Sequence, residues 1–202
     1  KAYMQYSTFA AIDIGSYDVI LEIFEISKKQ GIRSVDKICH RMELGKDTYT
    51  LGKIRPEMEE ELCRVLADFV RIMEGYHVDA YRAMASSAIS EAANSLYVLG
   101  KIRQLTGLSV TVLSNSEQRF LGYKALAAME DNFNKIIEKG TAILDLDGGS
   151  FQISLFDKDA LVTTQNIRMG SLRIRERLAG IQSETEHYEE MVEELIWNEV
   201  SG

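Results

Sequence analysis

Apolar and polar positions alternate in three segments near the start of the chain, which predicts strands with one buried face. These segments are residues 9–13, 19–26 and 32–42. The polar run Ser27–Gly31 ends in glycine and predicts a hairpin loop between the second and third segments. The chain is therefore expected to begin with three strands joined by short turns.

A helical spacing of apolar residues follows Pro56, because proline is favoured in the first turn of a helix. Gly75 is expected to end this helix. Its apolar residues are Met58, Leu62, Leu66, Phe69 and Met73. We interpret this stripe as core packing.

The remaining segments alternate between the two periodicities. Strands are expected at residues 80–85, 109–113, 141–145, 152–156 and 161–166, and helices at 88–105, 117–130, 172–179 and 184–200. This order is typical of an α/β protein with a mixed sheet and helices on its faces.

One short pattern occurs twice in the chain. Residues 11–16 and 143–150 each contain the end of a buried strand, an Asp and a Gly/Ser turn, and a second apolar strand follows each. No low-complexity linker separates the two copies. The repeat alone therefore predicts a first domain over residues 1–124 and a partial second domain over residues 125–202.

The repeated turns have the chemistry of an anion site. A tight Gly/Ser turn can aim several backbone N–H groups at one anion. The aspartates at the strand ends, Asp13 and Asp145, can hold a hydrated cation. Two such hairpins facing each other would form a cleft for phosphate and a divalent metal.

Composition narrows the class of protein. The chain is 46% hydrophobic and 27% charged, as expected for a soluble globular protein. No run approaches the roughly 20 apolar residues that cross a bilayer, and no secretory signal is visible. The net charge of −8 argues against a general nucleic-acid binder, although it permits a small or linear polyanion.

The sequence also contains a local basic segment and few residues suited to redox or zinc chemistry. The candidate basic patch consists of Arg168, Arg173, Arg175 and Arg177. Cys39 and Cys63 have no disulfide framework or zinc spacing, so we expect reduced, buried thiols in a cytoplasmic protein. The three histidines are interpreted as surface or partly buried polar residues.

Five segments, in order, resemble motifs of the exopolyphosphatase/guanosine pentaphosphate phosphohydrolase family, a branch of the actin-like superfamily. The segments are Ala10–Ser16, Ala85–Asn94, Val112–Arg119, Asp145–Ser150 and Met169–Arg173. The resemblance implies an actin-like (ribonuclease-H-like) α/β fold whose second copy is incomplete.

The resemblance also implies a Mg²⁺-dependent phosphohydrolase that releases terminal phosphate from inorganic polyphosphate or guanosine pentaphosphate. It assigns Mg²⁺ to Asp13 and Asp145, and additional positive charge to Arg119. The phosphate-binding residues that it implies are Gly15, Ser16, Gly148, Gly149, Ser150 and Arg173. The partners expected are such a phosphorylated ligand and a second copy in a homodimer, without nucleic acid or membrane.

Glu117 is the candidate that orients or deprotonates the attacking water. Aligning it with the family's catalytic Glu requires a one-residue gap, whereas the ungapped alignment places Gln118 there. A structural interpretation competes with both, because Ser114 and Glu117 have the spacing of a capping box at a helix start. The strand-ending aspartates likewise have a competing role as turn residues.

Four positions depart from the family pattern. Ser90 replaces an Arg, Gln152 replaces a metal-site Glu, Asp147 replaces the first Gly of the second turn, and Asp18 replaces a Ser of the first turn. These departures favour an alternative in which the protein is a catalytically silent sensor or regulator. A kinase of the same superfamily is a third reading, but the chain displays no adenosine-binding segment.

Overall fold

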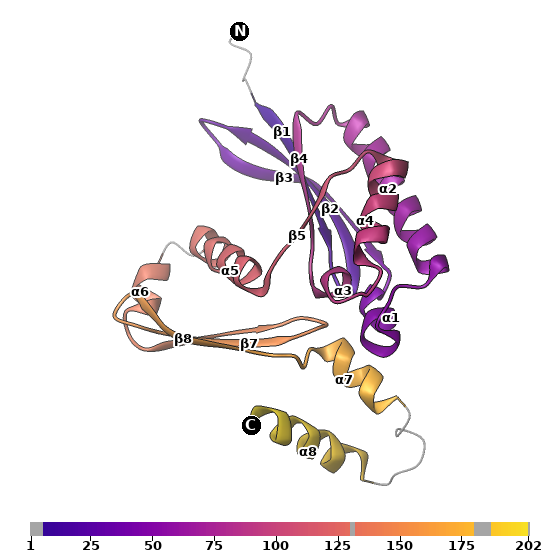
Figure 1. Cartoon of the computed structure of the whole chain (residues 1–202). Coiled ribbons are helices and arrows are strands. Elements are labelled where there is room, and N and C mark those ends of the chain that lie inside the picture. Colours follow the sequence, from indigo (N-terminus) through magenta and orange to yellow (C-terminus); the bar gives the residue numbers. More distant parts are fainter. Residues whose placement is uncertain (1–5, 130–131, 180–186, 202) are drawn as a thin grey trace. The chain divides into compact units, whose positions relative to one another are not determined.

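The computed structural model describes residues 6–129, 132–179 and 187–201. The chain divides into two compact units, Lys1–Leu113 and Ser114–Gly202 (Figure 1). The domain boundary expected from the repeat, between residues 124 and 125, falls inside a helix of the second unit. Each unit has its own β-sheet, so we describe each by itself.

The first unit has a five-stranded sheet in the order β3-β2-β1-β4-β5. The first three strands are antiparallel neighbours, and β4 and β5 run parallel to β1. Its elements are β1 (Ser7–Ile14), β2 (Asp18–Ser27), β3 (Gly31–Arg41), α1 (Leu44–Leu51), α2 (Pro56–Gly75), β4 (Ala80–Ala85), α3 (Ser87–Ser90), α4 (Ser95–Thr106) and β5 (Val110–Val112). The parallel strands β1 and β4 therefore end at the same edge of the sheet.

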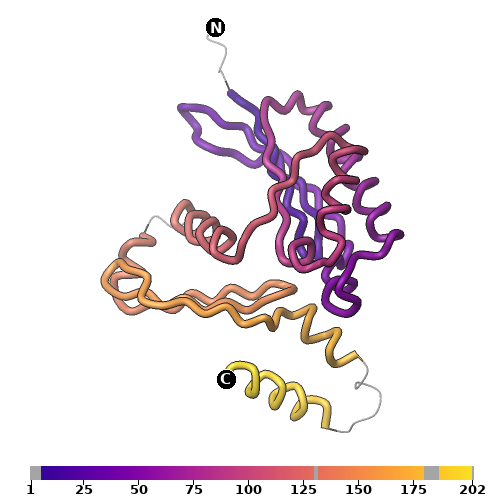
Figure 2. Tube along the Cα trace, in the orientation of Figure 1, coloured from indigo at the N-terminus to yellow at the C-terminus, as the bar shows by residue number. Residues whose placement is uncertain are grey.

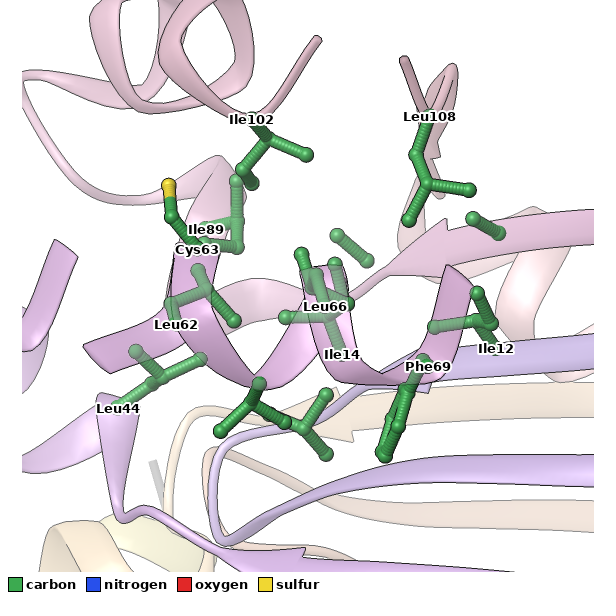
Figure 3. Packing of buried hydrophobic residues seen from close by; sticks show 14 of the residues in the cluster. Ile12, Ile14, Leu44, Leu62, Cys63, Leu66, Phe69, Ile89, Ile102 and Leu108 are labelled. Atoms are coloured by element: carbon green, nitrogen blue, oxygen red, sulfur yellow. The ribbon is translucent and has the colours of Figure 1, made fainter. Parts of the chain in front are cut away.

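Helices α2 and α4 cover one face of this sheet (Figure 1). Figure 3 shows Leu62, Leu66 and Phe69 of α2 packed with Ile12 and Ile14 of β1. All five side chains are buried, as the periodicity of the sequence predicts. Because their burial removes large apolar surfaces from water, this layer is the main source of stability in the first unit.

The second unit has an antiparallel sheet in the order β6-β7-β8. Its elements are α5 (Asn115–Met129), α6 (Phe133–Ile137), β6 (Thr141–Leu146), β7 (Phe151–Asp157), β8 (Ala160–Ile167), α7 (Ser171–Leu178) and α8 (Tyr188–Val200). The Tyr123 ring of α5 packs edge-on against Phe156 of β7 with centroids 5.2 Å apart, and its hydroxyl contacts Ser154. These contacts place α5 on one face of the three-stranded sheet.

The order of elements in the second unit repeats the order at the start of the first unit (Figure 2). Strands β6, β7 and β8 followed by α7 and α8 correspond to β1, β2 and β3 followed by α1 and α2. The described part of the second unit contains no counterparts of β4 and β5. The predicted α/β fold is thus confirmed.

The single helix predicted over residues 88–105 is instead two helices, α3 and α4. The chain leaves helical geometry between them because the side chain of Asn94 bonds to the segment between α1 and α2 and to α2 itself. Its Oδ1 accepts from Ile54 N at 3.0 Å, and its Nδ2 donates to Ile54 O and to Glu59 Oε1 at 2.8 Å. These long-range bonds override the local helical preference.

Three further features differ from the sequence-based predictions or extend beyond them. The short helices α1 and α6 were not predicted. Cys63 is buried as expected, but Cys39 is exposed because β3 is an edge strand and Cys39 lies on its solvent face. Residue 130 and residues 184–186, the expected ends of two helices, lie outside the described residues.

None of the helices in the described residues has both the length and the apolar character that crossing a membrane requires. The histidines lie where the sequence predicts them. His40 is half-buried, and its Nε2 lies 3.2 Å from Glu61 Oε1. His77 and His187 are exposed.

The packing of α2 predicts the effect of a core truncation. Leu66→Ala removes a side chain with no exposed surface, so we expect the free energy of unfolding to fall by about 2–5 kcal/mol. Leu96→Ala in α4 is the matched control, since Leu96 is 87% exposed, and should change stability by less than about 0.5 kcal/mol. Urea unfolding followed by circular dichroism measures both; equal losses would contradict the assigned core.

Candidate functional site

The first turn of the repeat spans residues 15–18 between β1 and β2, and Asp18 is also the first residue of β2. Ile14 pairs with Val19 across the hairpin, and Gly15 N donates to Asp18 O at 3.0 Å. A Cβ at position 15 would lie 3.1 Å from Asp18 O, which is a tight contact. Glycine is therefore the residue that this turn accommodates without a local shift.

The start of α1 holds the first turn in place. Gly45 N donates to Ser16 O, and Met42 N and Glu43 N both donate to Tyr17 O, each at 2.9 Å. The carbonyl groups of the turn are thus paired with backbone donors from the segment that begins α1. This pairing leaves the conformation of the turn little freedom.

A chain of three hydroxyl groups joins the first turn to the start of α3. Tyr49 Oη of α1 lies 2.7 Å from Ser16 Oγ and 2.8 Å from Ser87 Oγ. Ser16 was expected from the sequence, but Tyr49 was not, because no motif marks it and α1 itself was not predicted.

The second turn connects β6 to β7 through four residues, 147–150, and has the same framework. Leu146 pairs with Phe151, and Asp147 N donates to Ser150 O at 3.0 Å. This bond corresponds to the bond from Gly15 N to Asp18 O in the first turn. By this correspondence Asp147 occupies the position of Gly15.

The start of α7 holds the second turn, as the start of α1 holds the first. Ser171 N donates to Asp147 O at 2.9 Å, and the backbone N–H groups of Leu172 and Arg173 donate to Gly148 O at 3.1 and 3.0 Å. Arg173, expected to bind phosphate, also donates from Nε to Gly149 O at 3.0 Å. In both copies, backbone N–H groups from the segment that begins the next helix thus donate to carbonyl groups of the turn, although the accepting positions differ in part.

The carboxylate of Asp147 takes the donors of its own turn. Its Oδ1 accepts from Gly149 N at 2.7 Å and from Ser150 N at 2.6 Å. Its Oδ2 accepts from Gln118 Nε2 at 3.3 Å, and Ser150 Oγ lies 3.4 Å from the same oxygen. The sequence predicted that these N–H groups face phosphate, whereas in this structure they face a carboxylate of the chain.

The two strand-ending aspartates lie in different units. Asp13 is exposed on β1 between Ile20 of β2 and Met84 of β4, and Asp145 is exposed on β6 beside Gln152 of β7. Partial loss of solvation raises the pKa of Asp145, and the negative charge of Asp147 raises it further.

Within the described residues, no three His, Cys, Asp or Glu side chains are grouped so that they could hold a metal ion. Such a group is not required for Mg²⁺, which proteins commonly bind through one or two carboxylates together with phosphate oxygens and water. Either aspartate could therefore serve as a carboxylate ligand of Mg²⁺, with water or phosphate oxygens completing its coordination.

Glu117 forms a capping box at the start of α5. Its Oε2 accepts from Ser114 N at 2.8 Å and from Ser114 Oγ at 2.7 Å, and Glu117 N donates to Ser114 Oγ at 3.3 Å. These hydrogen bonds lower the pKa of the exposed Glu117 carboxyl, the backbone bond most. A carboxylate held in this way is a weak base but a fixed acceptor.

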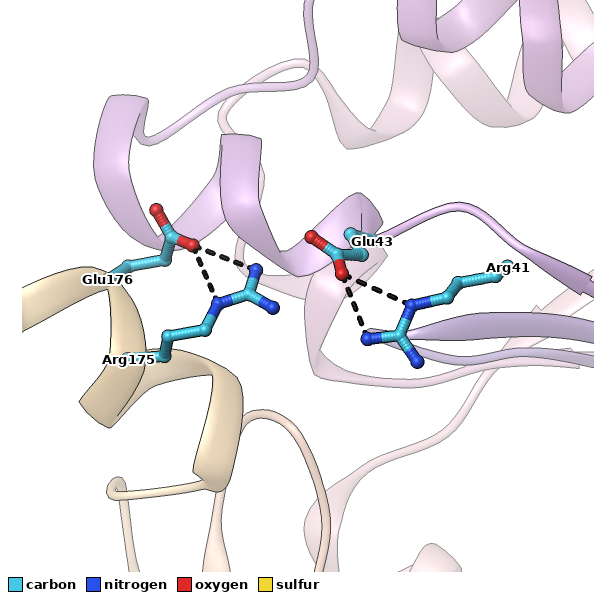
Figure 4. Close-up of polar contacts among 4 residues, drawn as sticks. All are labelled: Arg41, Glu43, Arg175 and Glu176. Atoms are coloured by element: carbon cyan, nitrogen blue, oxygen red, sulfur yellow. Dashed lines mark hydrogen bonds and ion pairs between the residues drawn. The ribbon is translucent and has the colours of Figure 1, made fainter. Parts of the chain in front are cut away.

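The basic segment around α7 is already engaged in contacts within its unit. Arg175 pairs with Glu176 at 3.0 Å, as Figure 4 shows, and Arg177 pairs with Glu199 of α8 at 2.7 Å. In the first unit, Figure 4 shows the similar pair of Arg41 and Glu43, at 2.9 Å. Arg119 donates to Thr164 Oγ1 at 2.9 Å. The positive charge of this segment is therefore partly balanced by neighbouring carboxylates.

The comparisons with known proteins agree with this architecture. A solved member of the Ppx/GppA family from Aquifex aeolicus has the same fold, with a TM-score of 0.72 and 23% identity, covering 98% of this chain and 62% of that one. The protein thus has the actin-like fold. The model of the Ppx/GppA phosphatase family matches residues 22–201, and the chain belongs to this family.

Two curated relatives are named for phosphatase activities. The bifunctional 3-dehydroquinate synthase/phosphatase of Fusobacterium nucleatum is 22% identical over 174 residues, which are 83% of this chain and 26% of the relative. Exopolyphosphatase 1 of Mycobacterium leprae is 26% identical over 144 residues, which are 71% of this chain and 41% of the relative. The chain thus spans less than half the length of either relative.

The contact of α7 with the second turn predicts a position where only glycine fits. A Cβ at Gly170 would lie 2.3 Å from Gly148 C and 2.4 Å from Gly149 N and Ser150 N. We therefore expect Gly170→Ala to destabilise the second unit by about 1–3 kcal/mol, since backbone must move to admit it.

Gly100→Ala in α4 is the control, because a Cβ there meets nothing within 4 Å and alanine favours a helix. This change should raise the free energy of unfolding by up to about 1 kcal/mol. Hydrogen exchange of the 147–150 amides localises the effect of Gly170→Ala. Unchanged protection of these amides would contradict the close packing of α7 on the turn.

Proposed function

We propose that this chain takes part in a Mg²⁺-dependent hydrolysis that releases terminal phosphate from inorganic polyphosphate or guanosine pentaphosphate. One observation carries the proposal: the same four-residue turn, with the same internal hydrogen bond, occurs twice in a chain of the Ppx/GppA phosphatase family. The curated relative named Exopolyphosphatase 1 supports polyphosphate as the first substrate to test.

Hydrolysis of a phosphoanhydride requires phosphate positioning, balance of negative charge and an oriented water. In this proposal the turns and one arginine position the phosphate chain. The residues with this role are Gly15, Ser16, Gly148, Gly149, Ser150 and Arg173. The hydroxyl chain through Tyr49 supports Ser16, because it fixes the direction of the Ser16 side chain.

Asp13 and Asp145 are the residues that would hold Mg²⁺, directly or through water. A bound divalent ion would supply positive charge to the transferred phosphoryl group. Partial burial and the charge of Asp147 raise the pKa of Asp145, and a nearby cation would offset both effects. Arg119 would supply additional positive charge.

Glu117 has the role of orienting the attacking water in this proposal. Its lowered pKa makes it a poor proton acceptor, but its fixed carboxylate can still accept a hydrogen bond from water.

We further propose that the protein acts as a homodimer in the cytoplasm. The relatives compared here are named as phosphatases and give no support to a catalytically silent sensor.

The first test is phosphate release by the full chain. We expect release of inorganic phosphate from polyphosphate that depends on Mg²⁺, and a loss of at least about tenfold in Asp145→Asn. Asp157→Asn, at the exposed end of β7, is the matched control and should keep the rate of the unchanged chain. Absence of Mg²⁺-dependent release from both polyphosphate and guanosine pentaphosphate would refute the proposal.

The second test separates the roles of Glu117. Glu117→Gln keeps a side chain that can serve in the capping box, so the Tm should change little; it removes the negative charge that strengthens the hydrogen bond to the attacking water, so the hydrolysis rate should fall about 100-fold. Thermal unfolding and phosphate release measure the two effects on the same preparation. Full activity in Glu117→Gln with loss in Gln118→Ala would favour Gln118 at the family's catalytic position instead.

A further inference from the structure

The N–H groups of the second turn already bind an anion that belongs to the chain. Gly149 N and Ser150 N both donate to Asp147 Oδ1, at 2.7 and 2.6 Å. Two backbone donors directed at one carboxylate oxygen are the arrangement that binds a phosphate oxygen. The carboxylate of Asp147 therefore occupies the place expected for the ligand.

The carboxylate is held from its other side as well. Gln118 Nε2 of α5 donates to Asp147 Oδ2 at 3.3 Å, and Ser150 Oγ lies 3.4 and 3.5 Å from the two oxygens. Hydrogen bonds to a charged acceptor are stronger than those between neutral groups. Removal of this carboxylate from the turn would consequently cost several such bonds at once.

The first turn has no acidic residue at the corresponding position. Gly15 stands at the position that Asp147 takes in the second turn, and both residues donate the same backbone bond. Because glycine has no side chain, residue 15 cannot fill the first turn with a charge. The two copies thus share a backbone framework, but only the second copy has an acidic side chain at this position.

We propose that Asp147 is an autoinhibitory residue, which fills the N–H cradle of the second turn and must be displaced before a phosphoryl oxygen binds there. The inference rests on the proposed function in one respect, that the ligand is a chain of phosphates. Competition between the Asp147 carboxylate and the ligand then regulates phosphate binding at the second turn.

Removal of the internal carboxylate tests this competition. Asp147→Gly gives the second turn the residue found in the first, so its affinity for inorganic tripolyphosphate should rise at least about tenfold. Asp147→Asn keeps a side-chain oxygen for the same N–H groups but removes the charge, and its affinity should lie between those of Asp147→Gly and the unchanged chain. Titration calorimetry on the full chain, without metal, measures all three.

The matched controls are Asp157→Gly and Asp157→Asn, which make the same changes of net charge at the exposed end of β7. Neither control should alter tripolyphosphate affinity. Equal gains at positions 147 and 157 would overturn the inference, because net charge alone would then explain them. No gain at position 147 would overturn it as well, and Asp147→Asn decides the matter if Asp147→Gly lowers the Tm too far.

Phosphate release measured on the same variants separates this inference from the proposed function. Tighter tripolyphosphate binding by Asp147→Gly without hydrolysis by any variant would support the internal anion and refute the phosphohydrolase. Hydrolysis by the unchanged chain with unchanged binding in Asp147→Gly would refute the internal anion alone.

Discussion

Both candidate phosphate-binding turns depend on the same backbone interaction, the hydrogen bond that closes the four-residue turn between the first two strands of each copy. Gly15 N to Asp18 O and Asp147 N to Ser150 O have the same length, 3.0 Å. The start of the following short helix then binds the turn carbonyls, at Ser16 in the first copy and Gly148 in the second. Because these bonds are between backbone groups, they persist while the side chains of the two turns diverge.

The two units support their turns with cores of different extent. In the first unit, α2 and α4 bury one face of a five-stranded sheet. In the second, Leu144 and Leu146 of β6 are 63% and 60% exposed, and α8 has no buried residue. Since stability follows buried apolar surface, the first turn rests on the more stable sheet and the second relies more on its bonds to α7.

The sequence predicts the parts of this structure that depend on local periodicity. The alternation in residues 9–13 and 19–26, and the helical stripe behind Pro56, report which face of each element is buried, and the capping box at Ser114 and Glu117 is likewise a local spacing. The fold class also followed from the order of these elements and of the five motifs. The strands and turns could therefore be predicted from a single sequence.

The parts that escaped prediction depend on side-chain contacts that no local periodicity reports. Helix α1 is short and polar, and its buried Asp47 is stabilised by Arg55, whose N and Nε donate to it at 2.9 Å. The bond from Tyr49 to Ser16 and Ser87, and the break imposed by Asn94, have no local signal either. Such features require the fold to bring their partners together.

The difference between the turns shows that a motif match can locate an anion-binding turn without telling whether its N–H donors are paired within the chain. Substituting Asp for Gly at position 147 leaves the backbone bond intact, so the turn still matches the pattern of an anion-binding loop. The added carboxylate nevertheless satisfies the N–H groups that define the loop's chemistry. A loop whose donors are paired internally binds an external anion only by exchange, and the net gain is the difference between two sets of charge-assisted bonds. Phosphate affinity in this protein therefore depends on the side chain at position 147 as much as on the fold that presents it.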